Sequence, residues 1–333
     1  MTAPIAGDPF GECTPTDYAA NVNVLGCKTA VKSTDQGLLN LAIDTFESLP
    51  HYRLNQRSPG LTVSLMLTSQ TRTWSRDAEP PQPAFSSGSG MLCATIDAGN
   101  FAVVDPSMSR ALICISSAML QHPYHARYEL IEFAFLTLAS RVQSLVPLHA
   151  ACVGSKNSGL LLMGPSGSGK STLSLHALAG EMQFLSEDSA FVSSPSLKIA
   201  GVPNYLYLQC GTLDFLEAGK LRRQIQTSPE IHRRSGVRKY QVNLREIPGN
   251  IARTPLQLAA TIMLSRRKVT VQPALKRLSR KLFVSRLRRE QPYAMSMSNW
   301  MEFENSIAKL PAYELRRTVH PDIAIRELQA LLS

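Results

Sequence analysis

The sequence lacks the features of membrane-spanning and secreted proteins. No apolar run reaches the roughly 18 to 20 residues that a helix needs to cross a bilayer. The longest apolar segment, residues 128–148, contains Glu129, Glu132 and Arg141. The first residues show neither the basic start nor the apolar stretch of a secretory leader. These absences predict a cytoplasmic protein that does not associate with membranes.

Paired cysteines are also missing. The six cysteines form no CxxC motif and stand far apart, at Cys13, Cys27, Cys93, Cys114, Cys152 and Cys210. In a chain of 333 residues this scatter is typical of reduced thiols in the interior. It argues against both a disulfide-built fold and a zinc site.

Charged residues are few, 18% of the chain, and they are unevenly distributed. Residues 1–148 hold 9 Lys and Arg against 12 Asp and Glu, whereas the remaining residues hold 26 against 13. The whole basic excess therefore follows Leu148. A basic region of this kind suits a polyanionic nucleotide and an acidic protein substrate, and it also suits a solvated surface rich in arginine.

Residues 1–144 have the pattern of a small α+β domain. We expect a helix over 38–50, a strand over 61–74, a Pro/Ser/Gly loop over 77–90, two or three short strands over 91–116 and a buried helix over 128–146. No spacing of His, Cys or carboxylates in this part resembles a catalytic or metal site. Its predicted role is substrate recognition or assembly.

The next segment reads as a β-hairpin. Two short apolar runs, 149–153 and 160–163, flank the polar turn "GSKNSG". If Val153 lies opposite Gly159, counting back along the hairpin places His149 opposite Met163. His149 would then lie beside the glycine-rich segment that follows.

That segment, "GPSGSGKS", fits the phosphate-binding pattern G-x-x-x-x-G-K-[ST] in full. Glycines let backbone N–H groups turn inward around a phosphate, and the helix expected over 170–179 directs its N-terminal dipole at the same anion. Lys170 is predicted to reach the β- and γ-phosphates, and the Ser171 hydroxyl to join a Mg²⁺ shell. The predicted nucleotide-binding residues are Gly164, Pro165, Ser166, Gly167, Ser168, Gly169, Lys170, Ser171 and Thr172.

Two carboxylates, Glu187 and Asp188, follow an apolar pair shortly downstream. An acidic residue at a strand end near such a loop holds Mg²⁺ or polarises a nucleophile. With Ser171, these two residues form the predicted metal site.

The stretches "LHAACV", "GLLLMGPSGSGKSTLSLHAL" and "FLSEDSAFV" together resemble the HPr kinase/phosphorylase family and the wider group of HPr-kinase-like serine kinases. The resemblance is good over residues 148–200 and loose from there to residue 333. It implies an α/β domain over 145–333, related in fold to phosphoenolpyruvate carboxykinases, in which a hairpin leads into the phosphate loop. It also makes a homo-oligomer plausible.

By this resemblance the chain is an ATP- and Mg²⁺-dependent kinase acting on a serine of a protein or peptide. Asp188, or Glu187, would orient and deprotonate the hydroxyl, and His149 would assist. Glu187 stands where the family has a first aspartate, and no segment resembles the family's "EIRGLGI". The resemblance therefore does not extend to a reverse, phosphorylase reaction or to HPr as the substrate.

Two other functions stay open. One is a kinase for a small molecule, free serine or a nucleotide, with the Arg-rich segment 220–239 as a lid. The other is a non-catalytic ATP-binding regulator or an ATPase. The Arg-rich segment is interpreted as a lid, a substrate grip or a surface loop, and residues 274–290 as an amphipathic helix with Leu275, Leu278, Leu282 and Leu287 on its apolar face. Because neither interleaves aromatics with its basic residues, we expect no nucleic-acid partner.

Overall fold

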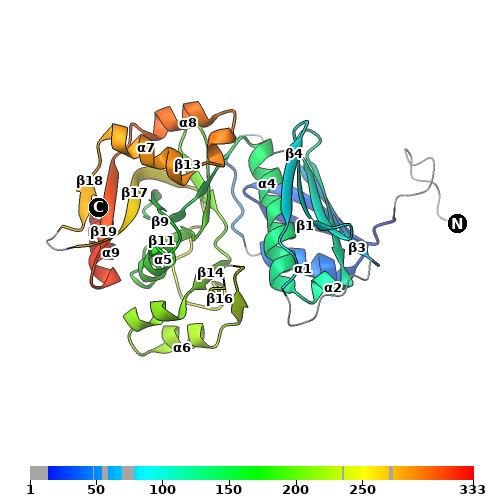
Figure 1. Cartoon of the computed structure of the whole chain (residues 1–333), viewed down its shortest axis with the longest axis horizontal. Helices are drawn as coiled ribbons and strands as arrows, with labels where there is room; N and C mark the ends of the chain where they lie inside the picture. Colours follow the sequence, from blue (N-terminus) through cyan, green and yellow to red (C-terminus); the bar gives the residue numbers. More distant parts are fainter. Residues whose placement is uncertain (1–13, 48, 55–58, 70–78, 235, 270–272) are drawn as a thin grey trace. The chain divides into compact units, whose positions relative to one another are not determined.

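The computed structural model describes residues 14–47, 49–54, 59–69, 79–234, 236–269 and 273–333. These residues fall into two compact units, one within the ranges Met1–Glu47 and Pro59–Ala139 and the other within Ser48–Ser58 and Ser140–Ser333 (Figure 1). Both units combine sheets with helices, which confirms the predicted mixed α/β class. Whether the chain divides into independent domains at residue 144 stays a prediction. Cys13 and residues 70–74 of the predicted strand lie outside the described residues.

The first unit is built on a seven-stranded mixed sheet of order β1-β2-β3-β7-β6-β5-β4. The inner strands β2, β3 and β7 run parallel, and the other neighbours are antiparallel. The strands are β1 (Tyr18–Val24), β2 (Cys27–Ser33), β3 (Leu61–Thr68), β4 (Ala84–Gly88), β5 (Met91–Asp97), β6 (Asn100–Asp105) and β7 (Arg110–Ser116). Strand β4 lies within the segment predicted as a loop. All five of its residues are exposed, so its sequence lacks the alternation of apolar and polar residues that identifies a half-buried strand.

Helices pack on this sheet through their apolar residues. Helix α1 (Gln36–Phe46) begins at Asp35, whose side chain accepts a hydrogen bond from the N–H of Leu38. Phe46 of α1 stacks on Phe135 of α4 (Glu132–Val142) with ring centroids 4.6 Å apart. The predicted helix over 128–146 is thus present, but it ends at Val142, and Val146 begins strand β8 (Val146–His149). Helical structure also starts earlier than predicted, with α2 (Ser117–Leu120), α3 (Pro123–His125) and the π-helix η1 (Ala126–Ile131).

The second unit contains a nine-stranded sheet whose main path is β11-β9-β10-β17-β13-β12-β8. Strand β10 lies between an antiparallel neighbour, β9, and a parallel neighbour, β17. Strand β17 also pairs in parallel with β19, and β19 pairs antiparallel with β18. The strands are β8 (Val146–His149), β9 (Ala151–Ser155), β10 (Ser158–Met163), β11 (Gln183–Ser186), β12 (Ser189–Val192), β13 (Lys198–Gly201), β17 (Leu256–Lys268), β18 (Leu275–Arg277) and β19 (Ala312–Arg317).

Both faces of this sheet are covered. Leu160 and Leu162 of β10 belong to the apolar cluster that includes residues of α5 (Lys170–Ala179) and α9 (Pro321–Ala330). Leu161 and Met163 belong to the cluster of α7 (Arg280–Glu290) and α8 (Trp300–Ile307). Because successive residues of β10 enter opposite layers, its sequence is a continuous apolar run. This packing fixes the strand end from which the glycine-rich segment starts.

A small three-stranded sheet of order β14-β16-β15 completes the second unit. Its strands are β14 (Tyr205–Leu208), β15 (Glu230–His232) and β16 (Arg238–Asn243), and α6 (Lys220–Gln226) shares its apolar cluster. The second unit also contains two short 3₁₀ helices, η2 (Cys210–Phe215) and η3 (Ala294–Ser296). The Arg-rich segment 220–239, expected to be loop-like, therefore contains α6, β15 and the start of β16.

The second basic segment also differs from its prediction. Leu275 lies in β18, and α7 begins only after Ser279, whose hydroxyl accepts a hydrogen bond from the N–H of Leu282. Leu282 is 43% exposed, so the predicted leucine face is wrong at this position; Phe283 and Leu287 carry the packing instead. Within the described residues, no helix combines the length and apolar character required to cross a membrane.

Candidate functional site

The hairpin that leads into the glycine-rich segment is present, with a different register from the predicted one. Strands β9 and β10 pair so that Val153 lies opposite Leu160 rather than Gly159. The reason is a tight turn at Lys156 and Asn157, both in the left-handed region with φ of 46° and 67°. This turn is shorter than the polar segment suggested, and it shifts the pairing by one residue.

His149 does not belong to the hairpin. It ends the separate strand β8, where it pairs with Ser189 of β12. Ala150 interrupts the extended chain between β8 and β9. The predicted position of His149 opposite Met163 is therefore wrong. The pairing with β12 nevertheless brings His149 beside the acidic pair that immediately precedes Ser189.

The glycine-rich segment forms a loop between β10 and α5. Gly167 and Gly169 adopt left-handed φ angles of 73° and 104°, which side chains rarely tolerate. At Gly164 a Cβ atom would lie 2.9 Å from the Ser168 hydroxyl oxygen, so the loop closes tightly on itself. The Ser168 hydroxyl is buried and has no hydrogen-bond partner among the described residues.

The start of α5 is available for a ligand. No side chain caps this helix end in the described part of the chain, so its first N–H groups and its dipole face the loop. Lys170 is buried, and its ammonium donates to the Gly164 carbonyl at 2.6 Å. Left-handed glycines, an uncapped helix start, an unpartnered hydroxyl and an ammonium together fit a phosphate group.

Burial and nearby charges act on the Lys170 ammonium in opposite directions. Loss of hydration lowers the pKa of Lys170, whereas the carboxylates of Asp188, Glu187 and Glu290 raise it. The lysine of the loop and the acidic pair thus belong to one electrostatic cluster. Thr172, also predicted to bind nucleotide, has its hydroxyl 3.3 Å from that of Thr212.

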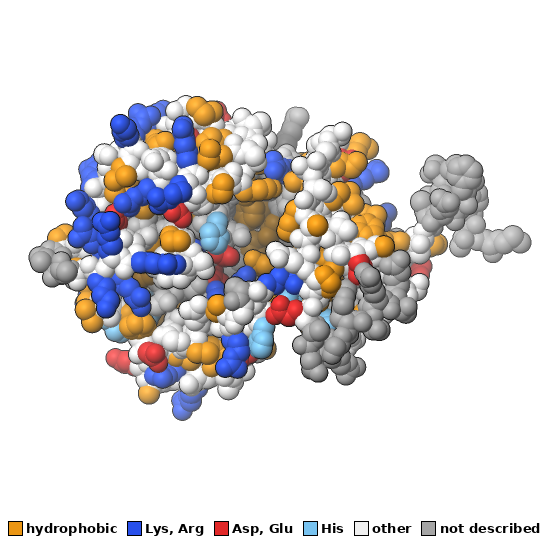
Figure 2. All heavy atoms as spheres, in the orientation of Figure 1, with side chains coloured by type: hydrophobic (Ala, Val, Ile, Leu, Met, Phe, Trp, Pro, Cys, Tyr) orange, Lys and Arg blue, Asp and Glu red, His pale blue; other side chains and the backbone are white. Residues whose placement is uncertain are grey.

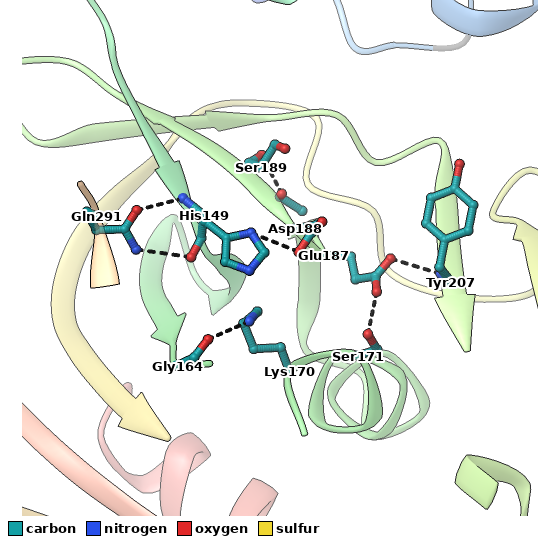
Figure 3. Close-up of polar contacts among 10 residues, drawn as sticks. His149, Gly164, Lys170, Ser171, Glu187, Asp188, Ser189, Tyr207 and Gln291 are labelled. Carbon is teal, nitrogen blue, oxygen red and sulfur yellow. Dashed lines mark hydrogen bonds and ion pairs between the residues drawn. The ribbon is translucent and has the colours of Figure 1, made fainter. Parts of the chain in front are cut away.

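Glu187 is buried, and both of its carboxyl oxygens accept hydrogen bonds (Figure 3). One accepts from the Ser171 hydroxyl at the start of α5. The other accepts from the backbone N–H of Tyr207 in β14, at 2.8 Å. Glu187 therefore ties the first turn of the loop helix to the three-stranded sheet and fixes the orientation of Ser171.

Burial raises the pKa of Glu187, the charge of Asp188 raises it further, and the ammonium of Lys239 in β16 opposes the shift. A carboxyl whose pKa is raised on folding stabilises the protein most at low pH, and that stabilisation is lost as the pH rises through the raised pKa. The ionised form of Glu187 is thus disfavoured by its surroundings, and the contacts with Ser171, Tyr207 and Lys239 offset part of that cost.

We therefore expect Glu187→Gln to remove this cost. Thermal unfolding should show the wild type losing stability relative to the variant as the pH rises above about 4.3, the ordinary pKa of a glutamate. An unchanged difference between pH 4 and 8 would contradict the raised pKa. Glu246→Gln, at an exposed carboxylate of the same unit, is the matched control.

Asp188 follows Glu187 in the bend between β11 and β12, and its carboxylate is directed toward His149 (Figure 3). Its carboxylate lies 3.1 Å from Nδ1 of His149, with 35% of the aspartate side chain and 51% of the histidine side chain exposed. Partial loss of hydration lowers the pKa of His149, and the charge of Asp188 opposes this effect. The two adjacent carboxylates thus differ: Glu187 is enclosed, and Asp188 is open to an incoming group.

The backbone of His149 is held by a residue far along the chain. Gln291, buried at the end of α7, accepts from the His149 N–H at 2.8 Å and donates to the His149 carbonyl at 3.1 Å. The Ala150 N–H donates to the Asp188 carbonyl at 3.2 Å. These bonds set the direction from which the imidazole meets Asp188.

The structure thus joins the predicted site residues in two pairs, Ser171 with Glu187 and His149 with Asp188, next to Lys170. Sequence reasoning missed Gln291, Tyr207 and Lys239. Tyr207 contributes through its backbone, which leaves no mark in the sequence. Lys239 was noted only as one of several basic residues in its segment.

No family model matches this sequence, and no curated protein matches it. Among solved structures, one similar chain is the HPr(Ser) kinase/phosphatase from Coxiella burnetii. The two share 11% sequence identity, and the match covers 55% of this chain and 88% of that chain with a TM-score of 0.29. A TM-score this low carries no conclusion about chemistry.

Proposed function

We propose that this chain is a kinase that uses ATP and Mg²⁺ to phosphorylate a serine hydroxyl of a protein or peptide. The observation that carries the proposal is the Asp188 carboxylate, which is partly exposed and held by His149 at 3.1 Å. Its charge also acts on Lys170, where it opposes the lowering of the Lys170 pKa by burial. A base placed beside a phosphate-binding lysine is the arrangement that transfer to a hydroxyl requires.

The residues present fit the two groups that such a reaction needs. The N–H groups of the loop and Lys170 would hold the phosphates of ATP, which supplies the γ-phosphoryl group. The Ser171 hydroxyl, with the carboxylates of Glu187 and Asp188, provides the hard oxygen ligands that Mg²⁺ prefers. Because Mg²⁺ usually takes only one or two carboxylates besides phosphate oxygens, this small set is sufficient.

Besides their shared place among the Mg²⁺ ligands, the two carboxylates have separate tasks in this mechanism. Asp188 accepts the proton of the serine hydroxyl as that oxygen attacks. His149 holds the Asp188 carboxylate, and Gln291 holds His149 through its backbone. Glu187 keeps Ser171 in position. Lys170 balances negative charge that develops on the transferred group.

Transfer of label from γ-labelled ATP tests the proposal. The purified full chain would be incubated with Mg²⁺ and, separately, free serine, HPr and a peptide library, with Lys170→Ala and Asp188→Ala in parallel. We expect label on a serine of a peptide or protein, lost in both variants. Label on free serine alone would replace the polypeptide substrate by a small one. Hydrolysis without transfer, unaffected by Asp188→Ala, would exclude the kinase and indicate an ATPase.

A further inference from the structure

One arginine lies against the phosphate loop and has no place in the mechanism above. Strand β17 runs parallel to β10 with Met263 opposite Met163. The next residues therefore proceed side by side: a Cβ atom at Gly164 would lie 3.1 Å from Cβ of Leu264. Two positions further, the Arg266 side chain reaches the loop, and its Nη2 donates to the Ser166 carbonyl at 2.5 Å.

The guanidinium of Arg266 lies at the outer edge of the loop. Its Nη2 is 3.7 Å from the place that a Cβ atom on Gly167 would occupy. The residue is exposed, and no carboxylate pairs with it in the described part of the chain. A guanidinium has five N–H donors, and the contact with Ser166 uses a single nitrogen. Donors therefore stay available to a ligand seated in the loop.

The surroundings of Arg266 favour an anion. Arg267 and Lys268 follow directly and are exposed, as is Arg317, which pairs with Lys268 across β17 and β19. Figure 2 shows Lys and Arg side chains gathered over the part of the second unit that holds β17, β18, β19 and α7. Such a concentration of one charge raises the local potential for a phosphate at the loop.

We propose that Arg266 binds the terminal phosphate of the nucleoside triphosphate and stabilises its charge during transfer. The proposal rests on the function proposed above for the same loop. A planar guanidinium binds phosphate oxygens through two parallel hydrogen bonds, which an ammonium cannot do. An arginine placed at the transferred phosphate is among the strongest contributions to phosphoryl transfer. The Ser166 carbonyl holds this arginine in place beforehand.

The competing role is structural: Arg266 would only brace the loop through Ser166. The two roles differ in their dependence on the γ-phosphate. A brace contributes equally to binding of ATP and ADP, because both require the folded loop. A contact with the terminal phosphate is made by ATP alone, so its loss changes the ratio of the two affinities.

Calorimetric titration of the full chain with MgATP and with MgADP separates these roles. We expect Arg266→Ala to weaken MgATP about 10- to 100-fold, the value of a hydrogen bond to a charged group, and MgADP less than about 3-fold. Arg266→Lys should recover part of the loss, because it keeps the charge without the planar fork. Arg267→Ala is the matched control, since its exposed side chain makes no hydrogen bond or ion pair in the described residues.

Equal weakening of both nucleotides, or no weakening of either, would overturn the proposal. Thermal unfolding of each variant checks that the loop's fold is retained. The measurement is independent of the acceptor. If the wild type binds both nucleotides and phosphorylates nothing, the kinase proposal fails, and the ratio of ATP to ADP affinity still decides the role of Arg266.

Discussion

An Asp188→Asn variant should transfer phosphate at least about 100-fold more slowly than the wild type, because general-base catalysis contributes 10²- to 10⁴-fold. Asparagine keeps the shape of the side chain and can still contact His149, but it cannot accept the proton of a hydroxyl at neutral pH. Affinity for MgATP should fall much less than the rate, since the loop N–H groups, Lys170 and two of the three proposed Mg²⁺ ligands, Ser171 and Glu187, are unchanged. Single-turnover transfer and equilibrium nucleotide binding, measured on the same preparation, check both expectations.

Two further variants serve as controls for this prediction. Glu217→Gln removes an exposed carboxylate from the same unit and should leave the rate unchanged. His149→Gln keeps a polar side chain beside Asp188 and should slow transfer less than Asp188→Asn, because the base itself survives. A rate for Asp188→Asn within threefold of the wild type would remove Asp188 from the mechanism.

The second large effect is expected at Lys170. We predict that Lys170→Met weakens MgATP by about 100-fold, within the range for loss of a hydrogen bond to a charged group, and lowers transfer at least as much. Methionine keeps most of the aliphatic volume of a side chain that is only 7% exposed. It therefore separates loss of the ammonium from loss of packing.

Removing the Lys170 charge also takes away one of two ammonium groups, the other being that of Lys239, that interact with both Glu187 and Asp188. We expect a shift in thermal unfolding as well, and this must be measured with the binding. Lys198→Ala, at an exposed lysine of β13, is the control for the loss of one positive charge. Retention of full ATP affinity in a folded Lys170→Met protein would contradict the phosphate-binding role of the loop.

The parts of the site that lie close together in the sequence were predictable from it. The spacing of the loop glycines and Lys170 determines a local backbone shape, so the pattern carries the geometry. The hairpin was equally readable, but its register was not, because a polar segment of six residues does not fix which of them form the turn. A shift of one residue in that turn changed every cross-strand pair.

The missed parts come from remote segments. Gln291 and Arg266 meet the site only because α7 and β17 pack where they do, and neither stands in a local motif. The exposed strand β4 was missed for another reason: a segment with both faces open to solvent carries no alternation of polar and apolar residues. Sequence patterns report burial and local backbone shape, whereas pairings between distant segments follow from the complete packing.

The clamp between Gln291 and His149 also bears on how the protein matures. It joins residues 142 positions apart, whereas the loop lysine and its acidic neighbours lie within 18 positions of one another. During synthesis at about 5–20 residues per second, the roughly 100 residues between Asp188 and Gln291 take on the order of 5 to 20 s. Throughout this interval the nascent chain carries the phosphate loop while the residue that fixes His149 has not been made. In the proposed mechanism, His149 is therefore fixed beside Asp188 only after most of the chain has been synthesised.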